Sequence, residues 1–214
     1  MYRFARRKKQ EPDLRYTGAM RTFVMGDPQV PFRQLQQVLE HHQLLNQAGN
    51  IADDVHLISV GDHFDYGMES TREAAAEGLA ILRWLTAQPR SRCTVLLGNH
   101  DTVRVMELMQ LASNSDFERA QVTARALYHK KKEVAGALSS DDEVAFRRSF
   151  PTIPTIGYAA RDYSAFAVEQ RELLMQVLLH ERVALAATVT LTDGRAALVT
   201  HAGVTTRETA MLAL

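Results

Sequence analysis

Three short apolar runs in this chain stop in the same way, each at a glycine followed by an aspartate or an asparagine. They occupy residues 22–25, 55–60 and 93–97, and the residues that stop them are Gly26-Asp27, Gly61-Asp62 and Gly98-Asn99. Stretches with helical spacing or composition follow the first two runs. Strands that alternate with helices predict parallel βαβ units with right-handed crossovers, and therefore an α/β fold.

A fourth polar cluster, His201-Ala202-Gly203, follows the last apolar run of the chain. In open α/β sheets, ligands bind beyond the carboxyl ends of the strands, so we expect all four clusters to meet at one edge of the sheet. Aspartate, asparagine and histidine ligate hard or borderline divalent metals through oxygen and imidazole nitrogen. The sequence therefore predicts a metal site at that edge.

The composition narrows the class of protein. Lysine and arginine number 25, as do aspartate and glutamate, so the formal net charge is zero, which argues against a dedicated nucleic-acid binder. The single cysteine, Cys93, excludes an internal disulfide and a cysteine-rich zinc site. No apolar run approaches the roughly 18 residues that span a bilayer, and the basic amino terminus lacks the apolar stretch of a secretory signal. We expect a cytoplasmic protein with no membrane partner.

Three regions differ in character along the chain. Residues 1–20 are rich in arginine and lysine and predict a flexible basic leader, and residues 21–214 form the domain. Within it, residues 102–180 are helical in composition and predict an insertion or lid. Near the end, the Asp193-Gly194 pair between two apolar runs predicts a β-hairpin.

Two of the polar clusters form longer motifs, Gly-Asp-x-x-Asp-x-Gly from Gly61 and Gly-Asn-His-Asp from Gly98. In this order, and at strand ends, they resemble motifs of the calcineurin-like metallophosphoesterases. The hairpin that leads into Thr-His-Ala-Gly-Val resembles the phosphoprotein phosphatase and diadenosine-tetraphosphatase branch. The resemblance implies an α/β/β/α sandwich with mixed sheets and a helical insertion. It also implies that the final strand and the last histidine motif are missing, so that the chain is truncated at its carboxyl end.

The resemblance assigns metal ligands residue by residue. It implies that Asp62 bridges two divalent ions and that Asp27 binds the first, with Gln29 where the family usually has histidine. Asn99 and His201 would bind the second ion. Oxygen-rich ligation favours Mn²⁺, while Fe²⁺, Zn²⁺ and Ni²⁺ are also admitted. Two ions in such a site stabilise the attacking and leaving oxygens and generate hydroxide near neutral pH.

The resemblance also implies a catalytic pair beside the ions. His100 would act near the leaving group, as general acid or as a cation in the transition state, and Asp65 would accept its other N–H. Tyr66 and Leu97 stand where protein phosphatases have arginines that clamp phosphate, which argues against phosphoprotein specificity.

These assignments predict a metal-dependent phosphoesterase that uses metal-bound hydroxide. Its substrate would be a phosphorylated small molecule, a nucleotide phosphoanhydride or diester, or a phosphoprotein. Two alternatives stay open. One is a nuclease of the same superfamily, which the zero net charge disfavours. The other is an inactive phosphatase fold used for binding, which Gln29 and the missing last histidine motivate.

Overall fold

A computed structural model describes residues 20–65, 71–133 and 138–203. The predicted leader, apart from residue 20, lies outside these ranges, as do Tyr66 and the residues after Gly203. Among the described residues, no helix is long and apolar enough to cross a membrane.

The core of the fold is a four-stranded sheet with strand order β1-β2-β3-β4, in which every neighbouring pair is parallel. Its strands are β1 (Arg21–Met25), β2 (Val55–Ser59), β3 (Cys93–Leu96) and β4 (Val183–Ala184). Helix α1 (Phe32–His41) follows β1, and α2 (Thr71–Ala87) follows β2. The predicted α/β fold with parallel crossovers is confirmed.

The apolar run that begins at Val183 is divided between two sheets. Its first two residues form β4 beside β3, whereas β5 (Ala186–Thr190) pairs antiparallel with β6 (Ala196–Thr200). The predicted hairpin is therefore confirmed, and Gly194 in its turn has a φ of 84°. Nothing in the residue types marks the break at Leu185, because the run is apolar on both sides. The second sheet has two strands within the described residues, so the mixed α/β fold is shown and a full sandwich is not.

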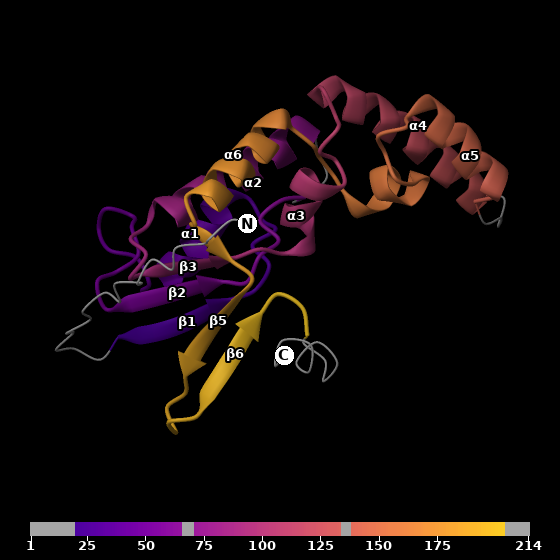
Figure 1. The fold of residues 1–214 in the computed structure, drawn as a ribbon. Coiled ribbons are helices and arrows are strands. Elements are labelled where there is room, and N and C mark those ends of the chain that lie inside the picture. The colour runs from indigo at the N-terminus through magenta and orange to yellow at the C-terminus, as the bar shows by residue number, and fades with distance from the viewer. Residues whose placement is uncertain (1–19, 66–70, 134–137, 204–214) are drawn as a thin grey trace, which may run out of the picture.

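Helices α2 and α6 (Val168–Leu179) pack together over the parallel sheet, and Figure 1 shows the hairpin extending away from them. Leu82 and Leu85 of α2 and Leu174 and Val177 of α6 join the buried residues of the strands in one cluster. Because these side chains leave water together, this cluster supplies the main hydrophobic stabilisation of the sheet.

The helical segment after β3 is divided between two cores. It contains α3 (Asn99–Met106), α4 (Asn114–Glu133), α5 (Ser140–Ser149), a π-helical turn η1 (Tyr158–Asp162) and α6. Helices α4 and α5 extend away from the sheet in Figure 1, and Phe117, Phe146 and Phe166 belong to a second buried cluster there. Residues 102–180 are thus largely helical where described, but their last helix belongs with the sheet. A lid function for this segment stays a prediction.

Candidate metal centre

The loops after β1, β2 and β6 bring three potential metal ligands together. Asp27, Asp62 and His201 each offer one ligand atom, and these atoms all lie within 4.8 Å of one another. His201 Nε2 lies 3.5 Å from Asp62 Oδ2, and His201 Nδ1 lies 4.0 Å from Asp27 Oδ1. Asn99, the first residue of α3, places its Oδ1 3.0 Å from His201 Nε2. Four of the five predicted metal ligands therefore meet at the carboxyl edge of the sheet.

Two glycines allow the second and third loops to touch. Gly61 has a φ of 111°, and a Cβ on it would overlap the backbone of Gly98. A Cβ on Gly98 would in turn overlap the carboxylate of Asp62. Asp62 itself has a φ of 56°, and its Oδ1 accepts a hydrogen bond of 2.9 Å from the His100 N–H at the start of α3. The Gly-Asp and Gly-Asn motifs are thus needed because two backbones come into contact here.

Asp101 connects the same two loops through hydrogen bonds. It is fully buried, and its Oδ2 accepts hydrogen bonds from the backbone N–H of Gly98 at 2.9 Å and of Asp62 at 3.0 Å. The buried His63 donates its backbone N–H to Asp101 Oδ1 and places its Nδ1 3.0 Å from Asp101 Oδ2. Burial raises the pKa of Asp101, but the charge and hydrogen bonds of His63 and of the backbone outweigh it, so the pKa lies below its ordinary value.

The donor set at this edge fits a divalent cation. In the tautomer whose Nδ1–H donates to the Val60 carbonyl at 3.1 Å, His201 directs the lone pair of Nε2 toward Asp62 and Asn99. Two carboxylates, an imidazole and an amide oxygen then converge, and a hard or borderline cation is what satisfies such acceptors together. Burial, the largest influence on Asp62, raises its pKa, because a carboxylate charge is costly away from water.

Gln29 has a different local role. Its Nε2 donates a hydrogen bond of 2.9 Å to the backbone carbonyl of Phe64. This bond ties the loop after β1 to the segment that carries Asp65. The side chain is therefore engaged on its amide nitrogen, while its carbonyl oxygen is the atom that a metal would require.

His100 and Asp65 form the predicted pair. Asp65 Oδ2 lies 2.8 Å from His100 Nδ1, and the side chains are 2% and 20% exposed for Asp65 and His100. Burial lowers the pKa of His100, but the hydrogen bond and charge of Asp65 and the charge of Asp62 outweigh it, so the pKa is raised above its ordinary value. The arrangement leaves Nε2 as the ring nitrogen available to a substrate.

Three residues around this pair were missed by the sequence analysis. Asp101 supports the loops, Arg104 forms an ion pair with Asp65 at 2.9 Å, and the ring of Tyr163 lies 4.8 Å from the His100 ring, centroid to centroid. Asp101 was visible as the last residue of Gly-Asn-His-Asp, and Arg104 lies one helical turn beyond His100. No signal in the sequence connects Tyr163 to this site.

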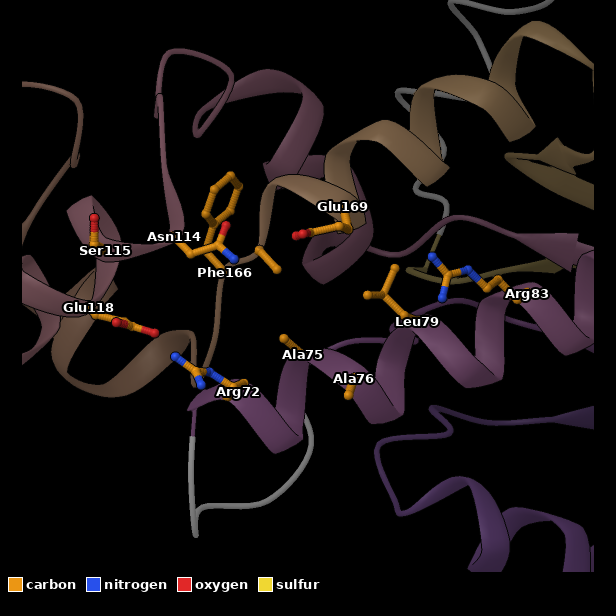
Figure 2. Close-up of a pocket in the computed structure, with 11 residues that line it drawn as sticks. Arg72, Ala75, Ala76, Leu79, Arg83, Asn114, Ser115, Glu118, Phe166 and Glu169 are labelled. Atoms are coloured by element: carbon orange, nitrogen blue, oxygen red, sulfur yellow. The ribbon is translucent and has the colours of Figure 1, made fainter.

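A separate cavity of about 550 Å³ lies between α2 and the beginnings of α4 and α6 (Figure 2). Two arginines, Arg72 and Arg83, and two glutamates, Glu118 and Glu169, line it together with apolar side chains. None of the predicted site residues lines this cavity. Its charges balance in sign, so they favour no particular class of ion.

The fold and this edge of the sheet agree with the result of the family comparison. The model of the calcineurin-like phosphoesterase family matches residues 20–172, and the chain belongs to that family. The match includes Asp27, Asp62 and Asn99 and ends before the hairpin that carries His201. Comparisons with curated proteins and with solved structures gave no match.

Proposed function

We propose that this chain is a metal-dependent phosphoesterase that hydrolyses phosphorylated small molecules or nucleotides. The observation that carries the proposal is the position of two groups of side chains. Potential ligand atoms of Asp27, Asp62 and His201 lie within 4.8 Å of one another. Asp65 lies on the same loop as Asp62, and its partner His100 follows Asn99 at the start of α3. Membership of the calcineurin-like phosphoesterase family supports this reaction class.

Divalent cations, with Mn²⁺ the first candidate and Fe, Zn or Ni as alternatives, would neutralise the phosphate charge and activate a water. Asp27, Asp62, Asn99 and His201 are the proposed ligands, and the carbonyl oxygen of Gln29 is a fifth. The carboxylates and the imidazole supply the types of atom that such ions bind.

The chain itself manages the proton of the leaving group. Asp65 accepts from Nδ1–H of His100, so a second proton can reside only on Nε2 of the imidazole. The raised pKa of His100 favours this doubly protonated form. Nε2–H then donates to the oxygen that leaves the phosphorus, which is general acid catalysis.

The position before Gly98 bears on the choice of substrate. Leu97 is 8% exposed and belongs to the hydrophobic cluster of the sheet, so it offers the phosphate neither charge nor a hydrogen-bond donor. We therefore propose small phosphate esters and nucleotides as substrates ahead of phosphoproteins. Membership of the phosphoprotein phosphatase and diadenosine-tetraphosphatase branch is likewise a proposal. A forked arginine is the usual means of holding phosphate in two directions, and none stands here.

The test is hydrolysis of p-nitrophenyl phosphate and of its bis ester by the chain with Mn²⁺ and after chelation. We expect turnover that depends on the metal and that Asp62→Asn abolishes on both esters. His100→Ala should abolish turnover of phenyl phosphate, assayed beside them, because its leaving oxygen needs the proton. Retained activity in both variants would overturn the assignment. An Asp54→Asn variant is the matched control, because Asp54 lies in an exposed ion pair with Arg21 before β2.

The hydrogen bond from the Gln29 amide to the Phe64 carbonyl favours a second candidate function, a phosphatase fold that binds its ligand without catalysis. Metal content after purification separates the two functions. About two bound ions per chain support catalysis, whereas fewer than one supports the binding function.

A further inference from the structure

Arg104 is the largest side chain in the fully buried part of the described core, and each nitrogen of its guanidinium has an acceptor. Nε donates to Gln170 Oε1 at 2.9 Å, and one terminal nitrogen donates to the backbone carbonyl of His100. The other terminal nitrogen lies 2.9 Å from both carboxylate oxygens of Asp65. The guanidinium carbon stands 4.6 Å from the centroid of the Phe64 ring. Arg104 thus contacts both members of the catalytic pair.

A second set of contacts reaches Asp65 from the far end of the helical segment. The backbone N–H groups of Ser164 and Ala165 donate to Asp65 Oδ1 at 3.0 and 3.1 Å. The carbonyl of Ala165 accepts from Arg104 at 2.7 Å, which closes the arrangement. Oδ1 is therefore held by two backbone donors and Arg104, and Oδ2 is directed to His100 Nδ1. These bonds define a single orientation of the carboxylate.

The imidazole of His100 is restrained on its face as well as at Nδ1. The Tyr163 ring lies 4.8 Å away at an interplanar angle of 53°, and the Tyr158 ring lies 4.3 Å from that of Tyr163. Both tyrosines come from the segment between α5 and α6. Residues 163–165 therefore contact the catalytic pair through one aromatic ring and two backbone N–H groups, and they contact Arg104 through one carbonyl.

We propose that Arg104 is a positioning residue that fixes the Asp65 carboxylate, and through it the His100 imidazole, against the segment at 163–165. The proposal rests on the proposed function, in which His100 donates a proton to the leaving group. A displacement of about 1 Å in a catalytic group can cost on the order of 10²-fold in rate, so loss of this restraint reduces proton donation while the metal ligands stay in place.

The variants are Arg104→Met, which removes every hydrogen bond, and Arg104→Lys, which keeps a charge but not the fork. Arg171→Met is the matched control. Arg171 also donates to backbone carbonyls, of Met109 at 2.7 Å and of Leu111 at 2.8 Å, and its guanidinium carbon lies 5.8 Å from the Phe166 ring centroid. No contact of Arg171 involves Asp65 or His100 among those that the structure describes.

Two substrates whose leaving groups differ in their need for a proton distinguish a positioning role of Arg104 from a general structural effect. Phenyl phosphate needs a proton at the leaving oxygen, and p-nitrophenyl phosphate needs it far less. For Arg104→Met we expect kcat on phenyl phosphate to fall about 100-fold, with less than about a fivefold fall on p-nitrophenyl phosphate and KM within about threefold. The kcat of Arg104→Lys on phenyl phosphate should lie between those of wild type and Arg104→Met. Arg171→Met should change both substrates equally, by less than about threefold.

An NMR readout on the metal-free protein tests the geometry without turnover. With ¹⁵N-histidine labelling, the hydrogen-bonded Nδ1–H of His100 should give a protected proton signal in wild type and Arg171→Met. The signal should be absent in His100→Gln, which assigns it, and lost in Arg104→Met. If Arg104→Met does not fold, Arg104→Lys carries both readouts, with partial losses expected.

The outcomes distinguish the two proposals. An inactive wild type whose His100 signal still depends on Arg104 overturns the proposed function and supports the positioning role. The positioning role is overturned if wild type is active, both Arg104→Lys and Arg104→Met keep the His100 signal, and their kcat falls by the same factor on both substrates.

Discussion

The two halves of the candidate site are held together in different ways. On one side, Asp65 is 2% exposed and receives hydrogen bonds from Arg104, His100, Ser164 and Ala165. On the other side, the Asp27 side chain is 50% exposed. The carboxylate oxygens of Asp27 and Asp62 and the Nε2 lone pair of His201 are all acceptors, and they face one another. The protein thus satisfies the Asp65 half with its own donors, whereas a cation would complete the half proposed to bind metal.

The largest test of this difference compares metal affinity in one variant from each half. Asp62→Asn should weaken Mn²⁺ binding by more than about 100-fold and abolish turnover, because Asp62 is the proposed shared ligand. His100→Gln should bind Mn²⁺ within about threefold of wild type and still lose about 10²-fold or more in turnover of phenyl phosphate, whose leaving oxygen needs the proton. Calorimetric titration with Mn²⁺ and steady-state assays measure both.

An exposed histidine gives the control for this comparison. His129 on α4 is exposed and remote from the proposed ligands, so His129→Gln should match wild type in both measurements. Equal loss of metal binding in Asp62→Asn and His100→Gln would show that the two halves are not separate.

The second test compares stability without metal. Asp65→Asn leaves the buried Arg104 without its counter-charge, which should lower the free energy of unfolding by about 3–5 kcal/mol. Asp27→Asn should leave it unchanged, because it removes an exposed charge from an acidic cluster, and should instead lose the stabilisation that Mn²⁺ gives wild type. Urea unfolding with and without Mn²⁺ checks both expectations. A large loss in metal-free Asp27→Asn would contradict the account.

The ion pair of Asp65 with Arg104 also predicts how stability depends on pH. Burial raises the pKa of Asp65, but Arg104 and His100 outweigh it and hold the pKa below its ordinary value. The stability that this carboxylate contributes is therefore present above its unfolded pKa of about 4 and is lost as pH falls through the folded value. Wild type should lose more stability than Asp65→Asn when the pH drops below about 4, and similar acid profiles would contradict this.

The smallest expected effect is at Gln29. Gln29→His supplies an imidazole at this proposed ligand position, and should tighten Mn²⁺ or Zn²⁺ binding by up to about tenfold. It also removes the hydrogen bond to the Phe64 carbonyl, at a cost of about 1 kcal/mol. Gln29→Leu loses the same bond without adding a ligand, and so separates the two effects. Tighter metal binding in Gln29→Leu would show that the gain does not come from the imidazole.

The sequence predicted the convergence of the proposed metal ligands better than it predicted their surroundings. Asp27, Asp62 and Asn99 each follow a strand directly, so the topology of a parallel sheet places them together without further information. The contacts of Asp65 with Ser164 and Ala165 join positions about 100 residues apart through backbone N–H groups, which leave no mark in residue type. Arg104 was open to prediction from its place one turn after His100, but its burial depends on the return of α6 to the sheet. The break at Leu185 depends in the same way on tertiary packing.

A Mn²⁺ titration of chelator-treated protein, with p-nitrophenyl phosphate as substrate, tests the central claim most directly. The account predicts no turnover without metal, a saturable rise in turnover with added Mn²⁺, and saturation at about two bound ions per chain. Turnover that chelation leaves unchanged, or its absence at every Mn²⁺ concentration while the ion binds, would contradict the account.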